Sequence, residues 1–157
     1  MIRPARPGDA PAIAAIWNRV IRETVATFTT LEKDEADLAR QIAEGASFNV
    51  ADDAGDVAGF VTAFQFRGGP GYAHTFEHSV HVAEAARGRG FGRALMAAAE
   101  ADLRARGIHS LFAGVSGENV AGIGFHAALG YHEAARLREV GWKFGRWHDL
   151  VLMQKML

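Results

Sequence analysis

Arg87-Gly88-Arg89-Gly90-Phe91-Gly92-Arg93 is the stretch that decides the fold of this chain. It follows Thr75–Val82, which we predict to be a strand, and it precedes the alanine-rich run Ala94–Arg106, which predicts a helix that ends at Gly107. A strand, a glycine-rich turn and a helix in this order are typical of the ligand-binding edge of an open α/β sheet.

The composition of this turn suits an anion. Its glycines carry no Cβ, so backbone N–H groups can close around a ligand, and the helix N-terminus adds partial positive charge. The three arginines add full charges, and the turn therefore predicts a pyrophosphate site; the alternative is a plain glycine turn with exposed arginines. A Walker loop would end in Gly-Lys-Ser/Thr, and a dinucleotide-binding fold would follow the Gly-x-Gly-x-x-Gly order, and this segment has neither pattern.

Outward from this turn, the pattern predicts the element order β-α-α-β-β-β-α-β-α-β-β. The first helix is expected after Asp9 as its cap, because apolar residues recur at helical spacing from Ile13 to Ile21. The remaining helices are predicted over 34–44, 94–106 and 120–129, and the strands over 48–51, 57–66, 75–82, 110–115, 131–140 and 150–155. We expect one domain over residues 1–157, a three-layer α/β fold with a mixed central sheet and helices on both faces.

Length and composition exclude several classes of protein. The chain has 157 residues, of which 49% are hydrophobic and 22% charged, and a formal net charge of -1. The chain lacks the excess of basic residues that is typical of nucleic-acid-binding proteins. The absence of cysteine excludes disulfides, thiolate metal sites and a cysteine nucleophile. No apolar run follows the N-terminus and none is long enough to cross a membrane, so we expect a cytoplasmic protein.

Arg87-x-x-Gly90-x-Gly92, placed after Ser79-Val80-His81-Val82, resembles the acetyl-CoA motif of the GCN5-related N-acetyltransferase (GNAT) superfamily. Three longer stretches narrow the resemblance to its phosphinothricin/methionine-sulfoximine acetyltransferase branch: residues 77–82, 125–131 and 141–149. Trp17-Asn18 and residues 24–28 also fit that branch, so the resemblance covers essentially the whole chain.

The resemblance implies a GNAT-type fold and direct transfer of an acetyl group from acetyl-CoA to the primary amine of a small amino-acid-like molecule. It implies that the backbone of Val80, His81 and Val82 holds the pantetheine arm and that residues 88–93, with Arg87, bind the pyrophosphate. Asn119 would bond the pantetheine or reach the thioester, although capping of the helix that it begins explains an asparagine equally well. A homodimer and the absence of a metal ion are also implied.

The reaction needs a base, because an ammonium must lose a proton before its nitrogen attacks. Glu77 is the candidate general base: it lies in an otherwise apolar and neutral strand, where desolvation would raise its pKa. An exposed glutamate at a strand end is the simpler alternative. His126 is the second catalytic candidate, as a proton relay for the thiolate, or as a packed helix histidine, and Tyr131 could protonate the thiolate or be a buried aromatic.

Two other functions remain open. His74, Glu77 and His78 match the H-x-x-E-H pattern of zinc peptidases, but that chemistry needs a helix, and on a strand Glu77 would point away from both histidines. An acetyl-CoA-binding domain without catalysis would keep the arginine turn and lose the base. Within the transferase class, a protein or polyamine amine is the alternative acceptor.

A carboxylate on the acceptor would need a cation, and Arg67 is the candidate before the Gly68-Gly69 loop. Relatives active on methionine sulfoximine often carry arginines at the positions of Ala73 and Phe76, so this chain departs from the branch there. Phe28, Tyr72 and Phe76 are predicted to line an apolar substrate pocket, to which Phe66 and Trp142 could also contribute. Lys143 and Arg146 could bind an anionic group or cross a subunit interface.

Overall fold

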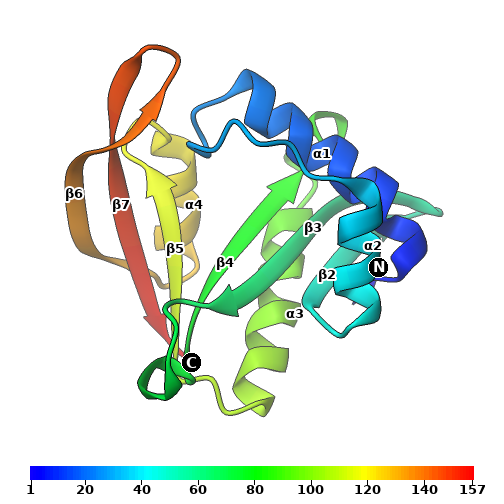
Figure 1. The fold of residues 1–157 in the computed structure, drawn as a ribbon. Coiled ribbons are helices and arrows are strands. Elements are labelled where there is room, and N and C mark those ends of the chain that lie inside the picture. Colours follow the sequence, from blue (N-terminus) through cyan, green and yellow to red (C-terminus); the bar gives the residue numbers. More distant parts are fainter.

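The computed structural model describes residues 1–157 and contains one seven-stranded sheet, in the order β1-β2-β3-β4-β5-β7-β6 (Figure 1). The strands are β1 (Ile2–Pro4), β2 (Ser47–Asp53), β3 (Asp56–Gln65), β4 (Thr75–Val82), β5 (Ser110–Ser116), β6 (His132–Lys143) and β7 (Arg146–Met156). Only β4 and β5 pair in parallel; every other neighbouring pair is antiparallel. The expected mixed sheet and element order are confirmed.

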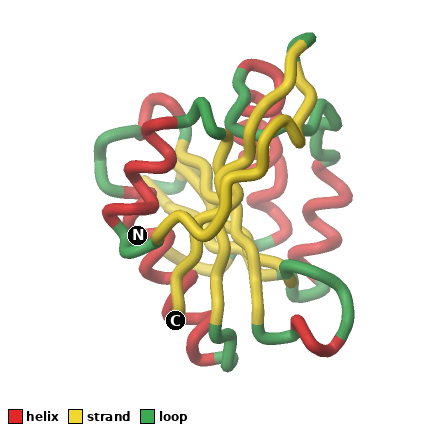
Figure 2. Tube along the Cα trace, turned by 90° about the vertical axis from the view of Figure 1, so that its left-hand side faces the viewer, coloured by secondary structure: helices red, strands yellow, loops and turns green.

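Helices cover both faces of this sheet (Figure 2). α1 (Ala10–Glu23) and α2 (Glu35–Ala43) pack on one face, and α3 (Phe91–Ala105) and α4 (Val120–Ala128) pack on the other. Successive residues of β3 belong to two different cores, because their side chains point to opposite faces of the sheet. Phe60 is buried with α1 and α2, and Val61 is buried with α3. The three-layer α/β architecture is therefore confirmed, and no helix is both long and apolar enough to cross a bilayer.

Leu95, Met96 and Leu103 of α3 have no exposed surface. Burying one side chain of this kind is worth about 1.5–3 kcal/mol relative to exposure, so this helix is anchored by its apolar face. The anchoring fixes the position of the turn before α3, which is the predicted anion site.

Two local predictions differ from the structure. Asp9 does not cap α1 with its side chain; its carboxylate binds the Arg3 guanidinium at 2.8 Å and accepts the Arg6 N–H at 2.7 Å, at a short 3₁₀ turn before the helix. The last two strands run further than predicted and meet in a tight hairpin. Phe144 and Gly145 form its two-residue turn with φ of 54° and 73°, the left-handed pair that suits the twist of a hairpin.

Candidate active site

A gap opens in the middle of the sheet, where β4 and β5 separate (Figure 1). Their parallel pairing stops at His78 and Ala113, although β4 continues to Val82 and β5 to Ser116. Beyond that point β4 pairs only with β3, and β5 pairs only with β7. Each strand therefore offers a free backbone edge to an extended ligand lying between them.

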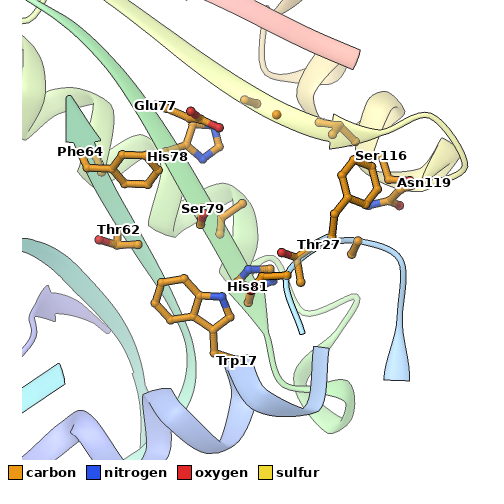
Figure 3. A pocket seen from close by; sticks show the side chains of 18 of the residues that line it. Trp17, Thr27, Thr62, Phe64, Glu77, His78, Ser79, His81, Ser116 and Asn119 are labelled. Carbon is orange, nitrogen blue, oxygen red and sulfur yellow. The ribbon is translucent and has the colours of Figure 1, made fainter. Parts of the chain in front are cut away.

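A cavity of about 580 Å³ lies over this gap, mainly on the α1 and α2 side, and Figure 3 shows side chains that line it. Glu77, Ser79 and His81 of β4 and Thr62 and Phe64 of β3 line it, because alternate residues of a strand share one face. Ala63 of β3 and His78 and Val80 of β4 also line it. The remaining lining comes from α1, α2, β2, β5, α4, β7 and the loops beside them, and includes Trp17, Thr27, Phe28, Lys33, Phe48, Gly114, Ser116, Asn119 and His126. Its volume suits a small molecule.

Glu77 is half-buried at one end of this cavity and has neither a hydrogen bond nor an ion pair. Its carboxylate lies against Gly114, where a Cβ would come within 2.9 Å of Oε1, so the glycine makes room for it. Burial raises the pKa of Glu77, because no nearby cation compensates the lost hydration. A desolvated, unpaired carboxylate is a stronger base than an exposed one.

The turn before α3 carries a row of unused donors. None of the backbone N–H groups of residues 88–93 has a hydrogen-bond acceptor. Gly88 and Gly90 have φ of 76° and 86°, which a residue with a Cβ adopts only under strain. Arg89 pairs with Asp53 at 2.7 Å, whereas Arg87 and Arg93 are exposed and have no carboxylate partner. Free N–H groups and unpaired arginines of this kind suit an anionic ligand.

His126 belongs to a buried aromatic cluster with His78 and Tyr131, with ring centroids 5.1–5.7 Å apart. Its Nδ1 donates to the Gly122 carbonyl at 2.7 Å, which leaves Nε2 as a lone pair in the neutral ring. Burial lowers the pKa of His126, so the neutral form is favoured. Nε2 is buried and has no partner, and in this tautomer it accepts a proton and does not donate one.

Tyr131 is turned away from the cavity. Its hydroxyl donates to Glu100 at 3.1 Å, and Lys155 completes the group by binding the other Glu100 oxygen at 2.5 Å. Burial raises the pKa of Tyr131. The structure therefore favours the buried-aromatic interpretation of this residue over proton donation to a thiolate.

Asn119 caps α4, since its side chain accepts the Gly122 N–H at 2.9 Å, and it also lines the cavity. A free amide nitrogen remains on the same side chain. The two roles that the sequence left open are thus compatible in this geometry, with the oxygen at the helix end and the nitrogen available to a ligand.

The predicted substrate residues do not gather in one place. Phe28 lines the cavity, and its ring covers Gly141. The same ring stacks on the His148 ring, with the two centroids 5.4 Å apart. Phe76 points to the opposite face of β4 from Glu77 and packs in the α3 core. Arg67 and Tyr72 also lie outside the cavity and contact each other, with the guanidinium 5.3 Å from the ring centroid.

Lys143 and Arg146 have structural partners. The Lys143 ammonium is buried and donates to the carbonyls of Thr24 and Thr27 at 2.6 and 2.8 Å, so it holds the loop that carries Phe28. Arg146 binds Glu118 at 2.6 Å. Neither residue is free to meet an anionic substrate group.

Trp17 and Lys33 are among the cavity residues that the sequence did not indicate. The Trp17 ring packs on the rings of Phe60 and His81, with centroid distances of 5.0 and 6.0 Å. The Lys33 ammonium lies 4.5 Å from the centroid of the Trp17 ring. Trp17 looks like an ordinary member of the apolar stripe of α1, and Lys33 lies in an irregular segment with no periodicity. Only the approach of α1 to β4 shows that both face the cavity.

The zinc-peptidase pattern does not form a site. Nδ1 of His74 donates to the Gly107 carbonyl at 2.9 Å, His78 is buried between β4 and α4, and Glu77 faces the other side of the sheet. The strand geometry therefore separates the three side chains, as the sequence analysis anticipated.

Comparison with known proteins identifies the family of this chain. Residues 13–131 match the model of the acetyltransferase (GNAT) family. An L-methionine sulfoximine/L-methionine sulfone acetyltransferase of Pseudomonas aeruginosa is 37% identical over 158 residues, which cover 98% of this chain and 92% of that protein.

Two solved structures are similar over the whole chain. A ribosomal-protein-alanine N-acetyltransferase from Brucella melitensis is 38% identical with a TM-score of 0.94, and the match covers 100% of this chain and 99% of that one. An acetyltransferase from Salmonella typhimurium with its cofactor acetyl-CoA is 34% identical with a TM-score of 0.95, covering 100% and 93%. With the separated strands, the donor-rich turn and this family match together, the chain belongs to the GNAT family and is an acetyl-CoA-dependent N-acetyltransferase.

Proposed function

We propose that this enzyme acetylates the primary amine of a small amino-acid-like molecule by direct transfer, with Glu77 as the general base. The observation that carries the proposal is the unpaired, half-buried Glu77 carboxylate at the point where β4 and β5 separate. The name of the Pseudomonas relative, which acts on methionine sulfoximine and methionine sulfone, supports the substrate class.

In this proposal the free edge of Val80, His81 and Val82 holds the pantetheine arm, and residues 87–93 bind the pyrophosphate. Bound acetyl-CoA supplies the thioester. Glu77 accepts the proton of the ammonium, directly or through one water, which frees the nitrogen lone pair to attack the acetyl carbon. As the carbon–nitrogen bond forms, the carbon–sulfur bond breaks and its electron pair leaves with sulfur. The acetylated nitrogen then loses its remaining extra proton, which water passes to the thiolate.

His126 has a narrower role here than proton donation. With Nδ1 committed to Gly122, the lone pair on Nε2 accepts a hydrogen bond from the thiol product once the sulfur is protonated. That proton comes from the acetylated nitrogen and is carried by water. The tautomer fixed by Gly122 therefore makes His126 a positioning group for the sulfur.

A protein amine is the competing acceptor, and the similar Brucella protein, which is named as an acetyltransferase of ribosomal-protein alanine, favours testing it. The cavity favours a small molecule, because Trp17 and the loop that carries Phe28 enclose it on two sides. A polyamine fits less well, since the one lysine that lines the cavity would repel its distal ammonium groups.

We also propose a homodimer, a single domain over residues 1–157 and a cytoplasmic location. Support for the dimer comes from the outer end of the β6–β7 hairpin, which exposes large apolar side chains: Val140, Trp142, Phe144 and Trp147, each more than half exposed. A cluster of this kind is typical of a surface that another chain covers.

The experiment is an amine panel with acetyl-CoA, in which thiol release is followed and products are identified by mass spectrometry. The panel contains methionine sulfone, methionine sulfoximine, phosphinothricin, spermidine and an alanine-terminated peptide. We expect acetylation of α-amino acids. Acetylation of the peptide alone would move the enzyme to protein acceptors, and no thiol release with any amine would favour a binding domain without catalysis.

A further inference from the structure

One cation lines the active-site cavity, and it is Lys33. Its ammonium lies over the ring of Trp17 and has no carboxylate partner. The acidic neighbours in the chain are engaged elsewhere: Glu32 pairs with Arg22, and Asp34 accepts the Asp37 N–H at the start of α2. The charge of Lys33 is thus available to a ligand.

The backbone of Lys33 is held in place by a side chain of α1. Asn18 accepts the Lys33 N–H at 2.7 Å and donates to the Lys33 carbonyl at 2.9 Å. The adjacent Trp17 is wedged against Phe48 and Phe60. A cation fixed at its backbone in this way loses less conformational entropy when it binds an anion than one on a mobile loop.

Glu77 and Trp17, over whose ring the Lys33 ammonium lies, are well separated in the cavity (Figure 3). Trp17 contacts His81, four residues along β4 from Glu77, which corresponds to about 13 Å of strand. The hydroxyl-bearing Ser79 and Thr62 line the space between them. The four-carbon stem of lysine lets its ammonium swing from the Trp17 ring toward this middle region.

No other full charge lines the cavity besides these two. Burial lowers the pKa of His78 to about 3 and of His81 to about 4, and the pKa of His126 is lowered by the same cause, so all three rings are neutral near pH 7. The cavity is therefore negative at Glu77 and positive at Lys33. An acceptor with its amine at one end and an anionic group at the other matches this polarity.

We propose that Lys33 binds an anionic group at the end of the acceptor remote from its amine, so that the preferred substrate is an amino acid whose side chain ends in a carboxylate, phosphinate or similar oxyanion. This inference rests on the proposed function and refines its substrate class. It assigns to Lys33 the charge recognition for which the sequence had suggested Arg67, and it needs no arginine at Ala73 or Phe76.

The test compares kcat/KM for matched acceptors that differ in the charge of the side-chain end: phosphinothricin with methionine sulfone, glutamate with glutamine, and aspartate with asparagine. We expect the wild-type enzyme to prefer the anionic member of the pairs that it accepts. Lys33→Gln should lower kcat/KM for that member about tenfold, through KM, and change the neutral member less than about threefold. Lys33→Arg should restore most of the loss, and Lys33→Glu should reverse the preference.

Arg104→Gln is the matched control, since Arg104 is exposed on α3, has no ion pair and lies outside the cavity. A wild-type preference for the neutral member of every accepted pair would overturn the inference. So would a Lys33→Gln enzyme that loses kcat/KM equally for both members of a pair, or one with a higher KM for acetyl-CoA. Activity only on amines outside these pairs would also overturn it while leaving the proposed function intact. Failure to acetylate any amine would instead remove the proposed function.

Discussion

At the scale of single residues, Glu77 and His126 differ in the hydrogen bonds that they already make. Glu77 makes none and His126 has one nitrogen committed to Gly122, so the first is free to take a proton and the second is fixed in one tautomer. The chemistry therefore depends on which side chains the fold leaves unpaired, and a linear sequence does not display that information.

Asn119 offers a test of two roles in one side chain. Asn119→Asp keeps the oxygen that caps α4 but loses the amide nitrogen, so we expect near-normal thermal stability and a higher KM for acetyl-CoA. Asn119→Ala loses both groups and should also destabilise the protein by about 1 kcal/mol. Unfolding curves and acetyl-CoA titrations separate the two effects. An unchanged KM for acetyl-CoA in both variants would leave Asn119 with the cap alone.

At the scale of elements, the turn before α3 carries free backbone N–H groups together with one arginine that is paired with a carboxylate and one that is not. Asp53 already neutralises Arg89, whereas Arg87 has no partner. We expect Arg87→Ala to raise the dissociation constant of coenzyme A more than Arg89→Ala does, and Arg104→Ala to have no effect. The losses should grow as salt is lowered, because exposed charges are screened less.

Acetyl-pantetheine, which lacks the pyrophosphate, provides the comparison for that turn. Its affinity should be the same for wild-type protein, Arg87→Ala and Arg89→Ala. If coenzyme A and acetyl-pantetheine bind the wild-type protein equally well, the assignment of residues 87–93 to the pyrophosphate is wrong.

Periodicity and glycine placement predicted the positions of the four helices and of six strands, because each of these elements has a local signal; β1, of three residues, has none. Two local features were missed for physical reasons. Asp9 precedes a helix as a cap would, but Arg3 of β1 competes for its carboxylate. The β6–β7 hairpin extends to a Phe144-Gly145 turn. Phenylalanine rarely adopts a left-handed φ, so its presence did not indicate a turn at this position.

At the scale of the whole molecule, the cavity depends on contacts between distant parts of the chain. Lys143 reaches across 119 positions to Thr24 and holds the loop that places Phe28 over Gly141. The sequence predicts Phe28 as a pocket residue, but it does not reveal that Lys143 is buried, because the two carbonyls that accept from its ammonium lie far away in the chain. The other predicted pocket residues lie outside the cavity: Arg67, Tyr72 and Phe76. They are close to Glu77 in the chain, but they lie on other surfaces of the folded protein.

The exposed tryptophans of the β6–β7 hairpin make the dimer testable. Trp142 and Trp147 contact each other at 4.8 Å and remain more than half exposed. We expect wild-type protein to sediment as a dimer and Trp142→Glu to sediment as a monomer, because a buried unpaired charge opposes association. Met156→Glu, which changes an equally exposed residue on the last strand, should stay dimeric. A wild-type monomer at micromolar concentration would refute the dimer.

The pH dependence of kcat/KM for the amine in wild-type protein and Glu77→Gln tests the account most directly. Glu77 acts as a base only when ionised, and its raised pKa places the acid limb of the wild-type profile at a higher pH than for an ordinary glutamate. Glu77→Gln should lower kcat/KM by about 10²–10⁴-fold and lose that limb, with acetyl-CoA affinity unchanged. Glu44→Gln, which alters an exposed carboxylate after α2, should behave as wild type. A Glu77→Gln enzyme with the wild-type rate and pH profile would contradict the account.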